Sequence, residues 1–519
     1  MNNNLKVIQT VAMSIPIVLC ADAVVEAKNV ENIQPQQDRA EVAIEARKQN
    51  SADLLLAKIE PGNSSLEDVA QSQIKSNSQS EEILSPSTDT LYLPNKPQKV
   101  QIRANRAITL EQAIELANRN NKQLQEARLN LEFSQQKLRE AKAARYPTLN
   151  GAIDLSQVDS AQSEISLAST SQQREDSSMS RSFNGNLNLK YDLYTGGLRG
   201  ASIQSAEKQV NVARLNLEQI NFETRFQTSR DYYSLQNADS QVENEQAAVN
   251  EAKQTFKDAQ LLKQAGSGTK FDVLRAEVEL ADAKQRLIIA ESEQSIARRQ
   301  LIATLDIGQQ VELETADKIE PAGDWQLSLE ETIVMAYDNR AELQQLLLER
   351  EINQQEKQIA LAAVRPQVSL VASYNLLDVY DDEVDMNDGY SVGANLEWNF
   401  FDGGAASAKA KQSETNAEIS EVQFANQRNE VRLEVEQGYY SLTASQDNIE
   451  TSKKALELAK ESLNLARSRF QAGEGTQTDV IQAQTNLTSA RANYLSSVVD
   501  YNQSLNQLER AVAILPDNK

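Results

Sequence analysis

The stretch SFNGNLNLKYDLYTGG, residues 182–197, alternates apolar and polar side chains with almost no interruption. Successive side chains of an extended strand point to opposite faces. One face would then carry Phe183, Gly185, Leu187, Leu189, Tyr191 and Leu193, and the other Asn184, Asn186, Asn188, Lys190 and Asp192. The first face requires apolar surroundings and the second requires water. A soluble sandwich and a membrane barrel with a wet lumen both produce this pattern.

Three further stretches alternate in the same way and predict strands of similar length. They are PTLNGAIDLSQV at 147–158, PQVSLVASYNLL at 366–377 and GYSVGANLEWNFFDGG at 389–404. An amphipathic strand of about 10 residues is long enough to cross a bilayer at a tilt. A sandwich would need a second sheet to cover the apolar face, and the sequence predicts none. The strands therefore favour a membrane barrel.

Four strands are too few to close a barrel, so the barrel must be shared between chains. An open strand edge in lipid would leave backbone groups without hydrogen-bond partners, which is costly. Two copies would give eight strands around packed side chains, whereas three copies would give twelve strands around a water-filled pore. The polar inner face favours three copies. We therefore predict an α+β membrane protein that forms a homotrimer with a 12-stranded β-barrel, four strands from each chain.

Two helices of unusual length are predicted at 198–264 and 405–471, each about 100 Å long at a rise of about 1.5 Å per residue. Their apolar residues follow a heptad, as in coiled coils: Ile203, Ala206, Val210, Ala213, Leu217 and Ile220 in the first helix, and Leu456, Ala459, Leu463, Ala466 and Phe470 in the second. Return helices are predicted at 269–305 and 476–513, and incoming helices at 109–145 and 328–364, stopped by Pro147 and Pro366. The combined length of one incoming helix and one return helix matches the length of one long helix, as if the two were stacked end to end beside it.

The predicted elements occur twice because the sequence repeats itself. TLEQAIELANRNNKQLQEARL from Thr109 matches SLEETIVMAYDNRAELQQLLL from Ser328, at an offset of 219 residues. Further along, YTGG at 194–197 matches FDGG at 401–404, and QAGSGTKFDVLRA matches QAGEGTQTDVIQA, at an offset of 207 residues. The extra residues that explain the difference between the two offsets lie in the polar segment 159–181, which we expect to be an exposed loop. We predict two structural repeats, 108–307 and 327–515, joined by a linker at 308–326.

Residues 1–23 have the features of an export signal: Lys6, a mostly apolar run from Val7 to Cys20, and small residues before a cleavage site after Ala23. Lipidation of Cys20 is the alternative, but lipidation sites require a small residue where this chain has Leu19. Residues 24–107 form a polar extension rich in Gln, Asn, Ser and Pro, with one helix expected at 37–58. No other stretch reaches the about 18 to 20 apolar residues of a spanning helix. Membrane crossing would therefore require the strands.

Composition argues against nucleic-acid binding and against an enzyme. The formal net charge is -23, whereas phosphate binding requires clustered Lys and Arg. The chain has no histidine and one cysteine, which removes the commonest general base and the commonest metal ligands. The run GSGTK at 266–270 lacks the spacing of a phosphate-binding loop and follows a predicted helix. We expect no catalytic residue, no metal site and no cofactor.

The exported, two-repeat chain, its YTGG and FDGG joins and its two QAGxGTxxDV turns together resemble the TolC-like outer-membrane efflux proteins, over residues 108–515. The resemblance implies a trimeric barrel in outer-membrane lipid of a Gram-negative-type cell, continued by a long α-helical coiled-coil tunnel in the periplasm. It also implies docking to a periplasmic adaptor (membrane fusion) protein and to an inner-membrane ABC or RND-type transporter. The channel would be a passive exit duct for efflux or type I secretion, with the energy supplied by the pump.

The helix turns at 264–270 and 471–477 are candidate functional sites. We expect Gly266, Gly268, Gly473 and Gly475 to supply left-handed backbone for tight turns. A purely structural role would explain these glycines, while the resemblance implies that the turns, with Thr269 and Thr476, form the adaptor-docking tips. At the other end of the long helices, glycine pairs are expected to let each strand break sharply into helix: Gly196, Gly197, Gly403 and Gly404.

Asp272 and Asp479 follow the two turns. Either can be a helix-start carboxylate that complements the helix dipole. The resemblance implies that Asp479 forms a constricting acidic ring at the periplasmic aperture, and that a second ring is missing because Gln482 stands at its position. It also implies that Asp272 matches the acidic partner of a Tyr and an Arg, onto which Phe470 and Gly475 map. Since neither can make the same contact, we expect a closed state that is held differently or more loosely.

Five aromatic residues lie at the end of the second predicted strand of each repeat, next to the helix joins: Tyr191, Tyr194, Trp398, Phe400 and Phe401. They fit an aromatic girdle at a membrane interface, and core packing at the joint between barrel and tunnel is the alternative. For the whole chain, the alternative function is a periplasmic coiled-coil adaptor or scaffold protein, which would share the helical hairpins. An adaptor would lack the alternating strands and would carry a Gly-rich lipoyl-like domain, which the sequence does not predict.

Overall fold

The computed structural model describes residues 104–159, 179–308, 310–379 and 386–514, together with residues 93, 95–97 and 101. The chain divides into two compact units, Met1–Ser78 and Gln79–Lys519, and all described residues lie in the second unit. The predicted signal 1–23, the predicted helix 37–58 and most of the polar extension 24–107 lie outside the described residues. So does most of the expected loop 159–181.

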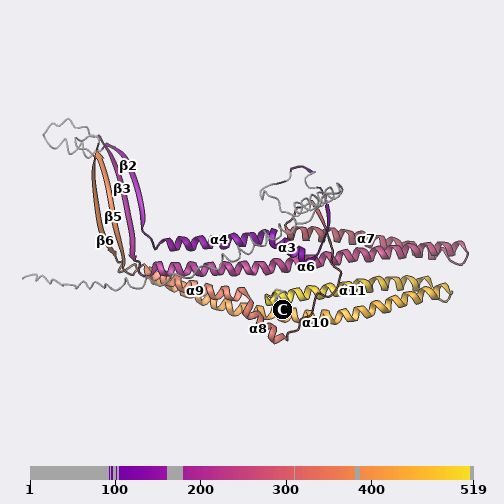
Figure 1. Ribbon diagram of the computed structural model, residues 1–519. Helices are drawn as coiled ribbons and strands as arrows, with labels where there is room; N and C mark the ends of the chain where they lie inside the picture. Colours follow the sequence, from indigo (N-terminus) through magenta and orange to yellow (C-terminus); the bar gives the residue numbers. More distant parts are fainter. Residues whose placement is uncertain are drawn as a thin grey trace, which may run out of the picture. The chain divides into compact units, whose positions relative to one another are not determined.

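The second unit is mainly helical, and its longest helices have the predicted lengths. α6 (Leu198–Gln264) and α10 (Ala405–Gln471) each contain 67 residues, and the return helices α7 (Lys270–Leu305) and α11 (Gln477–Val512) each contain 36. α7 packs along α6 and α11 packs along α10, so each pair forms a helical hairpin, and α11 also contacts α6 (Figure 1). The predicted heptad residues are buried or half-buried. No helix within the described ranges has an apolar stretch long enough to cross a membrane.

Each incoming segment is two helices, which corrects the prediction of one continuous helix at 109–145 and at 328–364. The first segment contains α3 (Leu110–Asn120) and α4 (Lys122–Ala143), and the second contains α8 (Leu329–Asn339) and α9 (Ala341–Ala362). Asn121, with ψ of 126°, leaves the helical conformation and accepts a hydrogen bond from the Leu124 N–H at 3.1 Å, so it caps α4. Arg340, with ψ of 113°, also leaves the helical conformation. Nη1 of its buried guanidinium lies 2.7 Å from Glu434 Oε2.

The predicted end-to-end arrangement beside the long helix is present in the first half of the unit. α4 and α7 both pack along α6, and α3 contacts both α6 and α7. In the second half α9 packs along α10, and α8 contacts α10 and α11. In addition α9 packs along α6, so α6 contacts both α9 and α11 of the other half.

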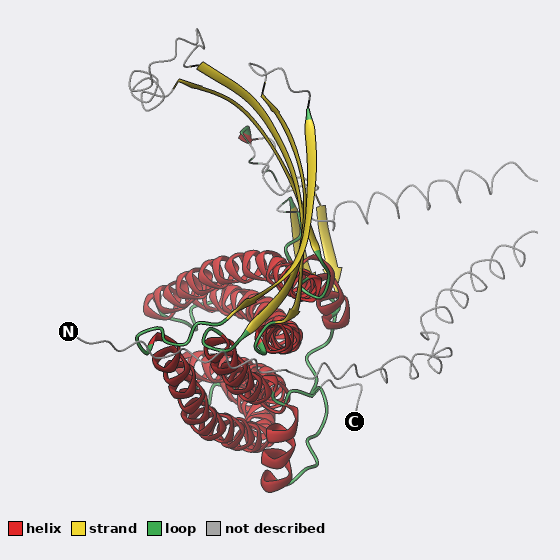
Figure 2. Ribbon diagram, turned by 90° about the vertical axis from the view of Figure 1, so that its left-hand side faces the viewer, coloured by secondary structure: helices red, strands yellow, loops and turns green. Residues whose placement is uncertain are grey.

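Four of the strands form one antiparallel sheet in the order β2-β3-β5-β6 (Figure 1). Figure 2 shows the same strands, in yellow, from another side. Their bounds are Thr148–Asp159, Met179–Tyr194, Gln367–Val379 and Asn387–Glu397. The pairing places Asn150 opposite Asn188, Asn188 opposite Ser373, and Ser373 opposite Ser391, so polar residues form a row across one face. Leucine 149 pairs with Leu189 on the other face. One face is therefore polar and the other apolar, as the alternation predicts. The regular pairing of β3 with β5 is interrupted by a bulge between Asp192 and Tyr194.

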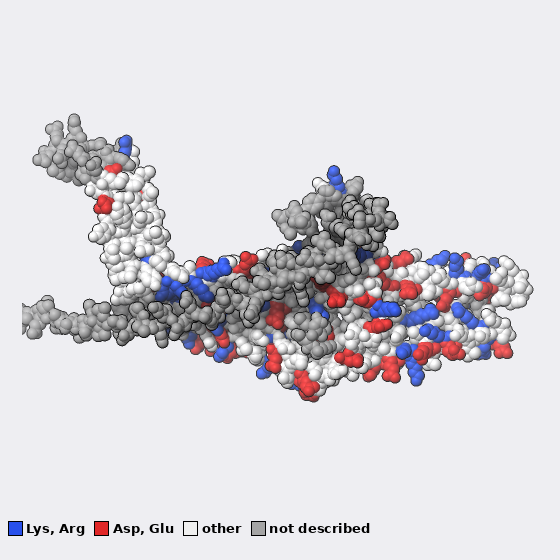
Figure 3. All heavy atoms as spheres, in the orientation of Figure 1, with Lys and Arg blue, Asp and Glu red and all other residues white. Residues whose placement is uncertain are grey.

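The apolar face of this sheet is not covered by any element of the same chain in the described part. Ile153 and Leu155 are each 72% exposed, and Val392 is 77% exposed. The visible face of the sheet is nearly free of charged side chains over most of its height, whereas side chains of both charges cover the helices (Figure 3). Such a continuous exposed apolar surface marks a contact with lipid or with another protein.

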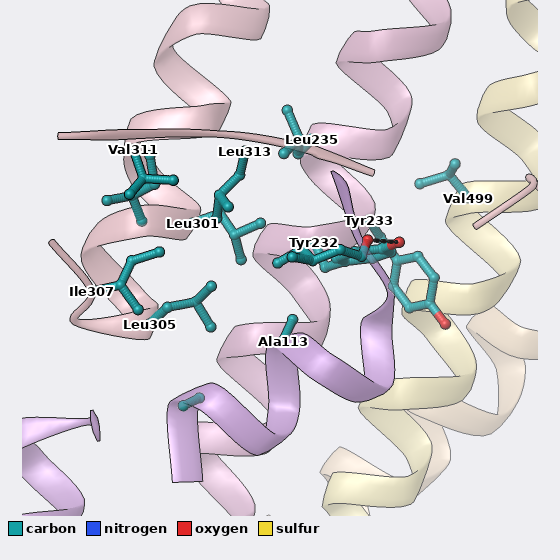
Figure 4. Close-up of a cluster of buried hydrophobic side chains, with 13 residues drawn as sticks. Ala113, Tyr232, Tyr233, Leu235, Leu301, Leu305, Ile307, Val311, Leu313 and Val499 are labelled. Carbon is teal, nitrogen blue, oxygen red and sulfur yellow. Dashed lines mark hydrogen bonds between the residues drawn. The ribbon is translucent and has the colours of Figure 1, made fainter. Parts of the chain in front are cut away.

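A second, two-stranded sheet was not predicted from the sequence. β1 (Ala104–Ile108) pairs in parallel with β4 (Val311–Thr315), which brings the end of the polar extension onto the start of the predicted linker. The main hydrophobic core lies where this sheet meets α3, α6 and α7 (Figure 4). Tyr232 is fully buried in this core, with its hydroxyl 2.8 Å from Asp317 Oδ2 and 3.1 Å from the Ile108 carbonyl oxygen. Burial and the Asp317 carboxylate raise the pKa of Tyr232, so its hydroxyl stays neutral.

The segment after β4 is tied to helices of both halves. On α6, Gln236 Nε2 donates to the Asp317 carbonyl at 2.9 Å. On α11, Asn502 accepts from the Ala322 N–H at 2.8 Å and donates to the Glu320 carbonyl at 2.9 Å. The linker is therefore held against α6 and α11 by backbone and side-chain hydrogen bonds.

Candidate functional site at the helix turns

The two turns that join the long helices to the return helices have the same backbone design. In the first, Gly266 has φ of +74°, and the Ser267 N–H donates to the Leu262 carbonyl at 2.9 Å. In the second, Gly473 has φ of +75°, and the Glu474 N–H donates to the Arg469 carbonyl at 2.9 Å. These bonds satisfy carbonyls at the helix ends, and only glycine adopts the required left-handed conformation without strain.

Gly268 and Gly475 are not left-handed, which corrects the prediction for these two positions. They are small for a different reason, because each lies against the helix that precedes its turn. A Cβ at Gly268 would lie 3.0 Å from the Lys263 backbone nitrogen, and a Cβ at Gly475 would lie 3.2 Å from the Phe470 nitrogen. The glycines therefore allow the chain to fold back closely onto α6 and α10.

Each return helix begins with a capping box. Thr269 and Thr476 are the N-cap residues, and their hydroxyls accept from the N–H groups of Asp272 and Asp479 at 3.2 Å. In return, Oδ2 of Asp272 accepts from the Thr269 N–H at 2.9 Å and from its hydroxyl at 2.6 Å. Asp479 accepts the same two bonds from Thr476 at 2.9 and 2.8 Å. Both aspartates thus have the local helix-start role expected of this pattern.

These bonds keep both aspartates ionised. Hydrogen bonds from the side chain and the backbone of Thr269 lower the pKa of Asp272, and nearby Arg275 lowers it further. Hydrogen bonds from the backbone and the side chain of Thr476 lower the pKa of Asp479, with a further contribution from Arg469. Donors that stabilise a carboxylate favour its charged form. Both turns therefore carry a negative charge at neutral pH.

Asp479 shares a groove with Gln482, whereas Asp272 lies on the other hairpin. The groove, of about 270 Å³ between α10 and α11, is lined by Arg469, Gly475, Asp479, Gln482 and Asn486 among others. Gln482 Nε2 donates to Asn486 Oδ1 at 3.0 Å, so its amide is engaged along its own helix. Within the described residues, no three Asp, Glu, Cys or His side chains are grouped so as to hold a metal ion.

Contacts between the two hairpins near the turns were not predicted. Arg275 Nη1 on α7 donates to Thr478 Oγ1 on α11 at 2.6 Å. Further from the turns, Glu251 on α6 pairs with Arg467 on α10 at 3.6 Å and with Arg491 on α11 at 3.4 Å. We call the contact of α6 with the second hairpin, made with α11 and through Arg467 with α10, the internal seam. These residues are far apart in sequence, so no local pattern could have paired them.

Phe470 packs on its own hairpin rather than across the seam. It is partly buried against a cluster formed by Leu463, Val480, Ala483 and Leu487. It also lines a groove of about 710 Å³ that lies between α6 and the second hairpin, together with Ala259, Leu262 and Arg467. Phe470 therefore makes hydrophobic contacts, and the ion pairs of Glu251 link α6 to the second hairpin.

At the opposite end of the long helices, glycine pairs connect strand to helix. Gly196 and Gly197 have φ of +62° and +96°, and Gly403 and Gly404 have φ of +70° and +90°. The surroundings of the two joins differ. A Cβ at Gly196 would lie 2.8 Å from Arg365 Cβ, whereas a Cβ at Gly403 would meet no atom within 4 Å.

Four of the five aromatic residues near these joins are exposed in the single chain, and Tyr191 is half-buried. The rings of Trp398 and Phe400 lie 4.5 Å apart, and Trp398 Nε1 donates to the Val364 carbonyl at 3.1 Å. Phe400 and Phe401 are 79% and 83% exposed, and Tyr194 is 52% exposed. They do not form a core within one chain, so their apolar surface is available to lipid or to another copy.

Three solved structures of outer-membrane proteins align with this chain over most of its length. CmeC, an outer membrane channel of Campylobacter jejuni, aligns with a TM-score of 0.68 and 16% identity, over 83% of this chain and 94% of its own. The outer membrane protein VceC of Vibrio cholerae aligns with a TM-score of 0.65 and 19% identity, over 78% and 96%. The open state of the MtrE outer membrane channel of Neisseria gonorrhoeae gives 0.64 and 16%, over 83% and 96%. None of the curated protein sequences compared with the chain gave a match.

The family model described as "Outer membrane efflux protein" matches residues 113–305 and 332–513. The two matched segments cover more than half of the chain and include both helical hairpins and all four strands of the exposed sheet.

Proposed function

This chain belongs to the outer membrane efflux protein family, and we propose that it is the passive exit duct of a tripartite export system. Three copies would share one 12-stranded barrel in the outer membrane, and their helices would continue it as a periplasmic tunnel. An inner-membrane ABC or RND-type transporter would drive export through a periplasmic adaptor. The duct would serve drug efflux or type I secretion.

The observation that carries this proposal is the sheet with one apolar and one polar face and two unpaired edges. Its apolar face is exposed along all four strands, and its polar face carries the row from Asn150 to Ser391. A bilayer leaves no unpaired strand edge, so the sheet must be completed by further copies. Twelve strands leave a water-filled lumen, which suits the polar face.

The helical turns support the periplasmic part of the proposal. The 67-residue helices span about 100 Å beyond the sheet. The turns at Gly266, Gly268 and Thr269 and at Gly473, Gly475 and Thr476 would be the tips on which the adaptor docks. Three copies of Asp479 around a narrow axis would form the aperture, with Asp272 beside it and Gln482 in place of a second acidic ring.

Two measurements test the proposal. Fractionation of membranes should recover the mature protein with the outer membrane, and native mass spectrometry in detergent should give three copies. A stable monomer that still conducts ions in a planar bilayer would overturn the shared barrel. Crosslinking in cells followed by copurification should recover an adaptor and an inner-membrane transporter. If the chain were a periplasmic coiled-coil adaptor or scaffold, fractionation would instead recover the mature protein in a soluble fraction.

A further inference from the structure

A cluster of basic side chains lies where α4 leads into β2. α4 carries Lys137, Arg139 and Lys142 near its C-terminal end. Arg145 stands in the turn that follows, three residues before β2 begins. Between Lys137 and Arg145 the sequence has a single carboxylate, Glu140, although the chain as a whole has a formal net charge of -23. Figure 3 shows Lys and Arg side chains gathered where the sheet meets the helices.

The fold adds a fifth cation from the start of α6. Arg199 Nη1 donates to the Asp192 carbonyl at 2.8 Å and to the Ala144 carbonyl at 3.4 Å, so its guanidinium joins the end of β3 to the end of α4. Lys142 Nζ pairs with Glu207 on α6 at 3.2 Å. These contacts hold the two helix ends together beside the sheet. We call the following residues the basic cluster: Lys137, Arg139, Lys142, Arg145 and Arg199.

Three members of the basic cluster are exposed and form no ion pair within the described part of the chain. Arg139 Nη1 donates to the neutral Gln136 at 3.3 Å, and Lys137 Nζ lies 4.8 Å from the centre of the Phe133 ring. Arg145 is exposed in its turn. The charges of these three side chains are therefore available to an anionic partner.

The second half of the chain shows that the fold does not require these cations. At the offset of 219 residues, the positions equivalent to the four cations of α4 and its turn carry no positive charge: Glu356, Gln358, Leu361 and Val364. At the offset of 207 residues, Ala406 stands in place of Arg199. Attraction to the helix dipole explains cations in the last turn of a helix, where α4 has only Lys142. The basic cluster is thus specific to the first half.

The basic cluster borders the apolar face of the sheet. Leu149, the second residue of β2, lies on that face and is exposed. Tyr146 stands between Arg145 and β2 and is 72% exposed, and Tyr194 at the end of β3 is exposed as well. Exposed aromatic residues that border an apolar surface are typical of a membrane interface. The basic cluster therefore lies where the apolar surface of the sheet gives way to the charged surface of the helices.

We infer that the basic cluster binds the phosphate groups of anionic phospholipids in the periplasmic leaflet of the outer membrane. The inference rests on the proposed duct, because that function places the sheet in lipid and the helices in the periplasm. Groups of Lys and Arg beside a membrane-crossing segment are attracted to anionic headgroups. A guanidinium binds phosphate oxygens through two parallel hydrogen bonds, which suits the arginines of the cluster.

The position of the basic cluster favours lipid over other partners. The cluster continues the apolar surface that the proposed duct places in the bilayer, and exposed aromatic rings stand beside it. Long cationic side chains lay their stems along apolar surface and keep their charges in water. Arg139 and Arg145 are therefore the members expected to bind phosphate oxygens. Carboxylates of a neighbouring copy are the other candidate partner.

Native mass spectrometry of the mature protein in detergent tests the inference. Dioleoylphosphatidylglycerol is the anionic probe, and dioleoylphosphatidylcholine is the zwitterionic reference. The test variant carries Arg139→Gln and Arg145→Gln, and a charge-retaining variant carries Arg139→Lys and Arg145→Lys. The matched control carries Lys453→Gln and Lys454→Gln, which replace two exposed cations of α10 about 70 Å along that helix from its start beside the sheet.

The unmutated trimer should bind phosphatidylglycerol at least about fivefold more tightly than phosphatidylcholine. Each Lys or Arg beside an anionic surface contributes about a factor of five to binding. The test variant should therefore bind phosphatidylglycerol at least about fivefold more weakly, with its affinity for phosphatidylcholine unchanged. The charge-retaining variant should keep most of the preference, and the control should keep all of it.

Equal binding of the two lipids by the unmutated trimer would overturn the inference, and so would an equal loss of binding in the control. If the test variant dissociates into monomers while its remaining trimers bind phosphatidylglycerol as before, the basic cluster contacts a neighbouring copy and not lipid. If the unmutated protein is itself a monomer, the shared barrel fails, and the same comparison of lipids on the monomer still decides the inference.

Discussion

Glu251 on α6 and Arg491 on α11 lie 3.4 Å apart although 240 positions separate them in the chain. With Arg467 at 3.6 Å, they form the ion-pair centre of the internal seam. Side chains of these three residues are 23%, 31% and 42% exposed, so the pairs are only partly screened by water. They lie about 20 Å from the turn that ends α6, measured along the helix.

We expect Glu251→Gln to loosen the internal seam and to raise the resting conductance in planar bilayers. Loss of the ion pairs should cost about 1 kcal/mol per chain. A change of that size alters a closed-to-open ratio about fivefold. Glu436→Gln is the matched control, because Glu436 pairs with Arg432 at 2.8 Å within α10. This ion pair does not link the two hairpins. Equal conductance of the two variants would exclude a closing role for Glu251.

Asp479 is expected to control ion selection at the aperture. Three carboxylates around one axis would create a focused negative potential that favours cations and binds multivalent cations. Asp479→Ala should lower cation selectivity and abolish block by trivalent cations applied from the periplasmic side, as measured in planar bilayers. Because Asp479 also caps α11, Asp479→Asn is the better charge-only variant. Persistent trivalent block in both variants would place the constriction elsewhere in the tunnel.

Asp272, on the other hairpin, supplies the comparison for that experiment. It has the same capping bonds to its threonine as Asp479 but does not line the groove of Gln482. Asp272→Ala should therefore change the closure of the tip and the resting conductance while leaving trivalent block largely intact. Loss of block in Asp272→Ala alone would reverse the roles of the two aspartates.

The two faces of the sheet should tolerate charge unequally. Leu189→Arg places a cation on the apolar face and should impair barrel assembly, at a cost of about 2 to 4 kcal/mol near the bilayer midplane. Asn188→Arg, its neighbour on the polar face, should assemble and alter ion selectivity. Heat-modified mobility on gels reports assembly, and bilayer recording reports selectivity. Equal assembly of the two variants would mean that the faces are assigned the wrong way round.

The capping boxes make the turns sensitive to acid. A carboxyl group whose pKa is lowered on folding stabilises the folded turn above its ordinary pKa of about 3.9. That stabilisation is lost as the pH falls through the lowered pKa. Hydrogen exchange at residues 476–480, corrected for intrinsic rates, should therefore be slow at neutral pH and accelerate below about pH 4. In Asp479→Asn the same amides should exchange faster at neutral pH and lose this pH dependence.

Local patterns in the sequence predicted the strands and the long helices well, because alternation and heptad spacing act within a single element. They failed where a side chain bonds far away in sequence. Arg340 ends α8 because its guanidinium is buried against Glu434, 94 positions later. The sequence predicted the helix turn but assigned Gly475 a left-handed backbone, which it does not have. A small residue is required there because Gly475 lies close to Phe470, and that approach depends on the path of the whole turn.

The candidate site was predictable to the same extent. The repeated QAGxGTxxDV pattern located both turns and both capping aspartates, since a capping box spans only four residues. The pairing of Arg275 with Thr478, and that of Glu251 with Arg467 and Arg491, required the three-dimensional packing of two hairpins. The sheet of β1 and β4 was missed for a similar reason, because each strand has five residues and pairs only with a distant partner.

The hydrogen bonds of the linker have a mechanical consequence. Asp317 ties the linker to Tyr232 and Gln236 on α6, while Ala322 and Glu320 tie it to Asn502 on α11. These bonds fix a pivot roughly midway along α6, and the remaining 32 residues or so to the turn act as a lever arm of about 48 Å. A tilt of about 5° at the pivot displaces the turn by about 4 Å. A displacement smaller than one side chain at the linker is therefore magnified at the far end of the helix.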